Sequence, residues 1–211
     1  MASNRGYSSI NALSRHRLIE AAGDLLGEEG YHSISARRIA ERAGLKPQLV
    51  HYYFRTMEEL VVAVFLKATE IHQLRHEDAV RSANPLRAFW DMNRHQSEAG
   101  QVTEYIALGK VFPLLREEMC KSGEHFRTLQ TDAIVELYAR RKIENPPISP
   151  AALGMLLASL ARNFAIEREC GMSGAHAELF AVVESIFKLF DPPAGSASGR
   201  DAAAGLALSS A

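Results

Sequence analysis

Hydrophobic and polar positions follow a helical period through most of the chain. Apolar residues recur three and four positions apart in residues 18–26, 60–71 and 153–164. No stretch shows the strict alternation of a half-buried strand. The pattern predicts an all-α fold of about nine helices.

Two short helices with defined ends are predicted within residues 33–60. The Ser35 hydroxyl can accept a backbone N–H of the first turn, and Gly44 can end that helix because it has no Cβ to oppose a positive φ. Pro47 fits the first turn of a second helix that ends near Phe54. Two helices joined by a glycine-containing turn form a helix-turn-helix, whose second helix fits the major groove of DNA.

The outward side of the second helix carries Gln48, His51 and Tyr52. A glutamine amide can pair with the adenine edge through two hydrogen bonds, and the other two side chains can reach phosphates or base edges. Val50, Tyr53 and Phe54 are assigned to the core. This helix is therefore the expected recognition helix.

Charge is distributed unevenly along the chain. Residues 1–57 contain eight Lys and Arg against five acids, whereas residues 58–211 contain sixteen against twenty. Phosphate contacts are therefore expected at the N-terminal end. Thr56 and Glu59 fit a capping box that would start a helix running on to Arg81.

Later helix ends follow from Pro, Gly and Asn. Asn84 and Pro85 begin one helix, and Gly109 predicts a kink or break in the next. The remaining helices are expected at about 85–93, 102–119, 124–142, 150–170 and 175–190. We divide the chain into a DNA-binding domain at 1–57, with 1–11 a disordered arm, a second helical domain at 58–190, and a disordered tail at 191–211.

Four short pieces keep the relative spacing of one known domain. They are Glu29-Gly30-Tyr31, Ile39-Ala40 with Ala43-Gly44-Leu45, Tyr53-Phe54, and Glu58-Glu59-Leu60. With them, residues 18–66 resemble the DNA-binding domain of TetR-family transcriptional regulators. The resemblance implies a homodimer that binds a pseudo-palindromic double-stranded DNA operator, most often as a repressor that a small, largely apolar ligand releases.

The resemblance and the motif together name the expected DNA contacts. They are Ser35, Arg37, Lys46, Pro47, Gln48, Leu49, His51, Tyr52, Arg55 and Thr56. Arg37 matches a position that reaches a base in the family. The chain departs from the family at Met57, where Lys is usual, and at Leu49 and His51, where Thr or Ser and then Tyr are frequent.

The resemblance also implies a ligand pocket and a dimer interface in the second domain. Pocket candidates are Trp90, Asn93, Tyr105, Phe112, Phe126, Met155, Arg162 and Asn163. The last two are polar residues in an apolar helix and fit a ligand anchor, a dimer contact or a surface contact. The last helix is apolar on more than one face. The dimer interface is therefore expected at Leu157, Leu160, Phe180, Val183 and Phe187.

Other classes of function have little support in the sequence. It has no Gly-rich phosphate loop, nucleophile elbow or paired-carboxylate motif, so no enzyme activity and no cofactor are expected. Two cysteines, no signal peptide and no long apolar run predict a cytoplasmic protein without a membrane partner. His72 and His76 have metal-ligand spacing, but an exposed polar face explains it and no metal is expected. An activator of the same fold and a dimeric ligand-binding module without DNA function remain alternatives.

Overall fold

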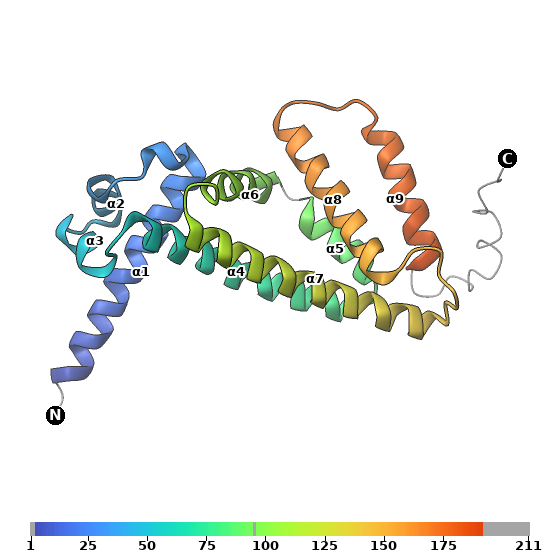
Figure 1. Ribbon diagram of the computed structural model, residues 1–211, viewed down its shortest axis with the longest axis horizontal. Coiled ribbons are helices and arrows are strands. Elements are labelled where there is room, and N and C mark those ends of the chain that lie inside the picture. Colours follow the sequence, from blue (N-terminus) through green and yellow to red (C-terminus); the bar gives the residue numbers. More distant parts are fainter. Residues whose placement is uncertain (1–2, 95, 192–211) are drawn as a thin grey trace. The chain divides into compact units, whose positions relative to one another are not determined.

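Every regular element in the computed structural model is helical over the residues it describes, 3–94 and 96–191 (Figure 1). The elements are α1 (Ser3–Glu29), a 3-10 turn η1 (Tyr31–Ser33), α2 (Ala36–Ala43), α3 (Gln48–Tyr53), α4 (Met57–Arg81), α5 (Pro85–Asn93), α6 (Gln96–Leu108), α7 (Pro113–Arg141), α8 (Pro150–Glu169) and α9 (His176–Phe190). The prediction of an all-α fold with about nine helices is confirmed over this part of the chain.

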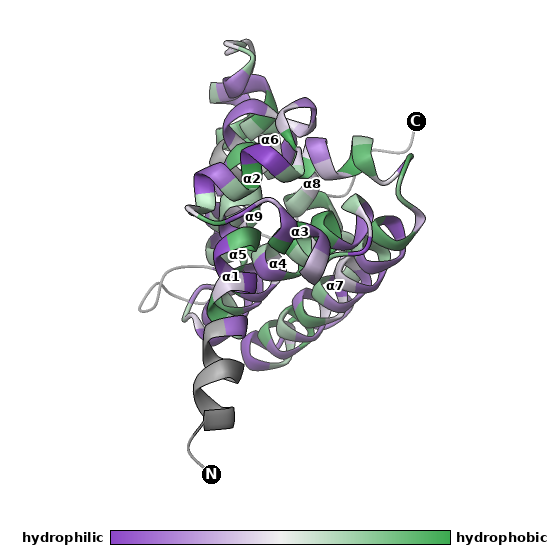
Figure 2. Ribbon diagram, turned by 90° about the vertical axis from the view of Figure 1, so that its left-hand side faces the viewer, coloured by the Kyte–Doolittle hydropathy of each residue, from purple (hydrophilic) through white to green (hydrophobic). Residues whose placement is uncertain are grey.

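The helices are amphipathic. Figure 2 shows hydrophilic and hydrophobic positions following one another along α7, as expected when one face is buried and the other is exposed. Among the described residues, no helix is both long enough and apolar enough to cross a bilayer.

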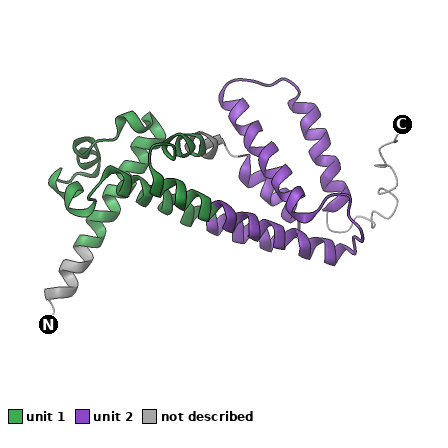
Figure 3. Cartoon of the chain, in the orientation of Figure 1, with its two compact units in different colours: residues 1–72, 100–122 green, residues 73–99, 123–211 purple. Residues whose placement is uncertain are grey.

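The chain divides into two compact units (Figure 3). Unit 1 contains residues 1–72 and 100–122, and unit 2 contains residues 73–99 and 123–211. Residues from the middle of the chain thus join the N-terminal helices in unit 1. The boundary between a DNA-binding domain and a second domain after residue 57 stays a prediction.

The core of unit 1 is formed by the buried faces of its N-terminal helices. Leu18 and Leu25 of α1, Ile39 of α2 and Leu60 of α4 are at most 2% exposed. Helices α6 and α7 add Tyr105, Leu108 and Leu115 to this core. The short helices α2 and α3 are stable because their apolar faces pack on this core, since isolated helices of that length are marginal in water.

The core of unit 2 combines α5, α7, α8 and α9. Its buried residues include Leu86, Trp90, Ile134, Leu137, Leu153, Leu157, Val183 and Phe187. Helix α5 packs directly on α8. The Arg87 guanidinium holds the Glu184 carboxylate of α9 through two bonds of 2.7 Å each. This bidentate pair joins the outer surfaces of α5 and α9.

Helix α5 begins after Asn84 with Pro85 in its first turn, as predicted. The Asn84 side chain, however, makes no capping bond, and its Oδ1 atom is buried without a partner among the described residues. Instead, the Leu86 N–H donates to Asp191 Oδ2 at 3.0 Å. Burial raises the pKa of Asp191 and the backbone N–H of Leu86 opposes that shift. The partner comes from 105 residues away, so local sequence patterns could not identify it.

The predicted break near Gly109 is confirmed, but the helix expected to begin after Gly123 is wrong. Helix α6 ends at Leu108 and α7 begins at Pro113, as expected for a proline in the first turn. Helix α7 then continues through Gly123 to Arg141 without interruption. One interior glycine costs only about 1 kcal/mol relative to alanine, and the buried face of α7 outweighs it.

The N-terminal end of the chain differs from the predicted layout. Helix α1 begins at Ser3 rather than near Ala12, so the predicted arm is helical from Ser3 onward. Met1 and Ala2 lie outside the described residues, as does the predicted tail after Asp191.

Candidate nucleic-acid interface

Helix α3 has one buried and one exposed side. Val50 is 2% exposed and Phe54, which follows the helix, is 3% exposed. Gln48, His51 and Tyr52 are all exposed, and 70% of the Tyr52 surface is accessible. A large aromatic side chain left in solvent on a short helix is available for contact with another molecule.

The turn before α3 is fixed by backbone geometry and by one side chain. Ser35 Oγ accepts the Arg38 N–H at 3.3 Å, which confirms the predicted N-cap of α2. Gly44 ends α2 with φ 64°, the left-handed region predicted for it. Arg17 of α1 donates to the Ala43 carbonyl at 2.6 Å. This last contact was missed, because nothing in the sequence connects α1 with the end of α2.

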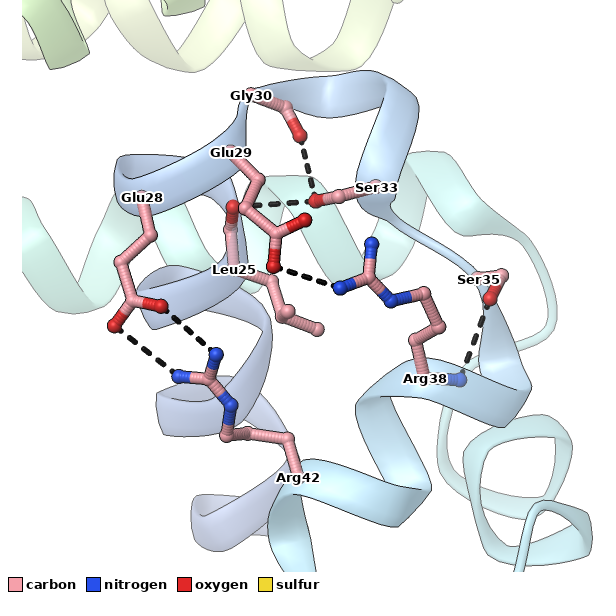
Figure 4. A network of polar contacts seen from close by, with 8 residues as sticks. All are labelled: Leu25, Glu28, Glu29, Gly30, Ser33, Ser35, Arg38 and Arg42. Carbon is pink, nitrogen blue, oxygen red and sulfur yellow. Dashed lines mark hydrogen bonds and ion pairs between the residues drawn. The ribbon is translucent and has the colours of Figure 1, made fainter.

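Two ion pairs join α1 to α2 (Figure 4). Arg42 binds both oxygens of Glu28, at 2.8 and 3.2 Å, and Arg38 binds Glu29 at 2.7 Å. Hydrogen bonds from these arginines hold the pKa of each glutamate below its ordinary value. Surface pairs of this kind stabilise little individually, but they direct both guanidinium groups toward α1.

Arg37 is exposed and makes no ion pair with another described residue. Its neighbours Arg38 and Arg42 are both engaged with glutamates. Of the three arginines on α2, Arg37 is therefore the one whose charge is open to an outside anion. This arrangement supports the choice of Arg37 over Arg38 as a DNA contact.

The other expected DNA contacts lie near α3 and at the start of α4. Lys46, Pro47, Arg55 and Thr56 are exposed. Leu49 differs, because it is half-buried and packs against the core of unit 1. Only part of its side chain is free to meet a thymine methyl group.

The capping box at α4 forms with one difference from the expected pattern. Thr56 Oγ1 accepts the Glu59 N–H at 3.1 Å, as predicted. The Glu59 carboxylate accepts the N–H of Arg55 at 2.8 Å, one residue before the predicted donor. The box fixes the chain between α3 and α4 and so positions the Arg55 side chain.

The predicted ligand residues do not form one cluster. Trp90 is buried and Asn93 donates to the Phe89 carbonyl, both in unit 2. Phe126 of the same unit stacks on His76 at 4.3 Å between ring centroids. Tyr105 and Phe112 belong to unit 1 instead, where burial raises the pKa of Tyr105 to about 12.

The three predicted ligand residues on α8 are exposed. Met155 has 58% of its surface accessible, and Asn163 donates to Glu167 at 2.8 Å. Arg162 makes no ion pair with another described residue. Desolvation lowers the pKa of its guanidinium, and the charge of Arg127 lowers it further.

Three of the five residues predicted for the dimer interface are buried within the single chain. Leu157, Val183 and Phe187 are at most 2% exposed in the single chain and form the core of unit 2. Leu160 and Phe180 are half-buried against the same core. The exposed apolar residues that α8 and α9 leave available are Met155, Leu156 and Val182.

His76 is not on an exposed polar face. It is 1% exposed, its Nε2 lies 3.1 Å from Gln130 Nε2, and its ring stacks on Phe126. The prediction that His76 lies on an exposed polar face of its helix is thus wrong. No group of three possible metal-binding residues occurs among the residues that the structure describes.

The sequence of the N-terminal unit matches one family model. Residues 18–64 match the model described as bacterial regulatory proteins, tetR family. The chain is 37% identical over 54 residues to the HTH-type transcriptional regulator BetI of Rhizobium meliloti, and 31% identical over 49 residues to a fatty acid metabolism regulator protein of Bacillus subtilis. These alignments cover 26% and 23% of this chain and 27% and 25% of the relatives, about a quarter of their length.

Solved structures show the same fold over most of the chain. A regulator from Saccharomonospora viridis in complex with choline has a TM-score of 0.71 at 14% identity, with 84% of this chain and 96% of that chain covered. A regulator from Rhodococcus has a TM-score of 0.61 at 21% identity, with 72% and 82% covered. Residues 18–64 thus match the DNA-binding domain of the TetR family of bacterial regulatory proteins, and most of the chain shares its fold with solved transcriptional regulators.

Proposed function

We propose that this protein represses transcription by binding double-stranded DNA as a homodimer, and that a small ligand releases it. The observation that carries the DNA-binding part is the exposed face of α3, whose Gln48, His51 and Tyr52 project from a helix anchored by Val50 and Phe54. A rigid helix with polar and aromatic side chains outward matches what enters a major groove.

Phosphate contacts are proposed on both sides of this face. Arg37, Lys46 and Arg55 are exposed, and none has an ion pair recorded within the described part of the chain. Such contacts set the position on DNA and the salt dependence of binding, while α3 supplies sequence preference.

The experiment for the proposed function is fluorescence anisotropy on DNA from upstream of the gene, across a salt series. Tight binding that resists competitor DNA, with a steep salt slope, is expected. Added protein should lower transcript yield from that promoter in vitro. A rise in yield would make the protein an activator, and binding no tighter than to random DNA would leave a dimeric ligand-binding module.

Replacing Gln48 by alanine should relax base preference at one operator position. Loss of a bidentate contact costs about 1 to 3 kcal/mol of discrimination at the base it reads. A panel of operators with single base changes, measured by anisotropy, tests this. If all positions keep their preferences, Gln48 does not read a base.

Replacing Arg55 by alanine should weaken binding to every sequence alike and lower the slope of log K against log salt by about 1. The control is Arg116→Ala, which removes the same charge from an exposed position on α7 of the same unit. The control should leave the slope unchanged. A loss confined to the specific operator would contradict the phosphate role of Arg55.

Dimerisation is proposed through the exposed apolar residues of α8 and α9. Leu156 and Val182 are 40% and 55% exposed. A two-fold dimer would place two copies of α3 about 34 Å apart, or a multiple of that distance, which is the spacing of half-sites on DNA.

Leu156→Glu should therefore convert the dimer to a folded monomer in sedimentation velocity. The charge would be desolvated in the interface but solvated in the monomer. The matched control is Val135→Glu, at a position on α7 that is 49% exposed. An intact Leu156→Glu dimer would place the interface on another surface.

The effector is proposed to bind in unit 2. Trp90 lies edge-on to Phe180 at 5.9 Å, and both residues pack near Phe164, which forms an apolar aromatic cluster. Arg162 remains the proposed polar anchor, because it has no ion pair recorded in the described part of the chain. Ligand binding is expected to change DNA affinity by a coupling energy of about 1 to 3 kcal/mol.

A further inference from the structure

A cavity lies within unit 1, in the part of the protein that carries α3. It has a volume of about 500 Å³ and is lined by residues of α1, α4, the end of α3 and the first turn of α7. Small-molecule sites typically have volumes of roughly 300 to 1,000 Å³. The proposed effector residues of unit 2 take no part in it.

Apolar and charged side chains both line this cavity. Ile19 and Phe54 are buried residues of its lining, and Val62 and Ala63 of α4 also line it. Leu66 also lines the cavity and is 39% exposed. An exposed leucine beside an apolar cavity favours an occupant with an apolar body.

One cation that lines the cavity has no protein counter-ion among the described residues. The Arg15 guanidinium lies over the Phe54 ring at 5.2 Å and has no carboxylate partner recorded among residues 11–94 and 102–191. Lys67 has a carboxylate only at 3.7 Å, from Glu70. The Glu59 carboxylate already accepts the N–H of Arg55. Arg15 is thus the cation of the lining that no carboxylate of the described residues binds, although Glu59 and Glu70 also line the cavity.

We propose that this cavity binds a small amphipathic carboxylate. The apolar chain of the ligand lies against Ile19, Val62 and Ala63, and its carboxylate binds Arg15. Arginine binds carboxylates through two parallel hydrogen bonds, and contact of its other face with Phe54 keeps the guanidinium at the cavity wall.

Occupancy of this site would act on DNA binding directly, a consequence that rests on the proposed function. Tyr53, the last residue of α3, lines the cavity and donates from its hydroxyl to Asn11 Oδ1 at 3.2 Å. A ligand that displaces the Tyr53 ring changes the position of α3. Coupling between two sites typically changes affinity by about 5- to 150-fold.

The test is isothermal titration calorimetry of the full chain with octanoate, in the absence of DNA, with octanol as the uncharged probe. Octanoate should bind at least about tenfold more tightly than octanol, because a charge-assisted hydrogen bond contributes that much. Arg15→Gln should weaken octanoate by about tenfold or more. Ala63→Phe, which fills the cavity, should abolish binding. The control Arg116→Gln removes a cation from an exposed position outside the cavity and should bind octanoate like the wild type.

Three results would overturn the proposal. They are no octanoate binding, equal binding of octanol, and octanoate binding that survives both Arg15→Gln and Ala63→Phe, which would place the ligand elsewhere. Circular dichroism checks that Ala63→Phe is folded, and if it is not, the exposed Arg15→Gln variant decides alone. Because no DNA is present, failure of the DNA-binding proposal would leave this result unaffected.

Discussion

Truncating Phe187 to alanine should destabilise the protein by about 3 to 5 kcal/mol. The ring is 2% exposed, packs with α5 and α8 in the core of unit 2, and carries the Arg87 guanidinium over one face at 4.6 Å. Removal of the ring leaves a cavity and takes away the aromatic face on which Arg87 stacks. Against a typical total stability of about 5 to 15 kcal/mol, this loss is large. Urea unfolding followed by circular dichroism measures it as a lower midpoint.

The control for Phe187 is an exposed apolar residue of the same unit that lies outside the proposed dimer interface. Val135→Ala on α7 should change stability by no more than about 0.5 kcal/mol, because Val135 is 49% exposed. If Phe187→Ala instead gave a folded monomer with an unchanged midpoint, Phe187 would belong to a subunit interface rather than to the core of one chain.

Phe187 also shows what the sequence could not decide. The surplus of apolar residues on the last helix was visible, but a helix that packs on several neighbours in one chain has the same composition as one that packs on a second subunit. Only the burial of Leu157, Val183 and Phe187 within unit 2 separates these two cases.

Sequence patterns predicted helix caps and helix ends correctly where the residues that form them are close together in the chain. Ser35 caps α2, Gly44 ends it in the left-handed region, and Thr56 caps α4, each through a partner within four residues. Gly109 and Pro113 correctly predicted the break between α6 and α7. These features depend on backbone sterics and on hydrogen bonds that a short window of sequence contains.

Signals that depend on distant partners were missed. Asp191 binds the first turn of α5, and Arg17 binds the end of α2 across the fold. The same limit applies to the candidate ligand residues, because aromatic side chains at helical spacing are alike in the core and in a pocket. Tyr105 and Phe112 pack in unit 1, whereas Trp90 packs in unit 2.

Replacing Gln48, His51 and Tyr52 together by alanine should abolish sequence-specific DNA binding while leaving non-specific binding nearly intact. Base contacts contribute about 1 to 3 kcal/mol each, so three of them account for a large part of the factor of about 10³ or more between specific and non-specific affinity. All three side chains are exposed, so their removal should not disturb the core around Val50. Anisotropy on operator and random DNA at one salt concentration measures both affinities.

The matched control for the triple variant removes charge and keeps the recognition face. Lys46→Ala should weaken operator and random DNA by the same factor, because a lysine–phosphate contact carries no base preference. The triple variant should bring the two affinities together, whereas the control should keep their ratio. If the triple variant retained the ratio, sequence would be read by another element, and Arg37 on α2 would be the next residue to replace, because no ion pair with the described residues holds its charge.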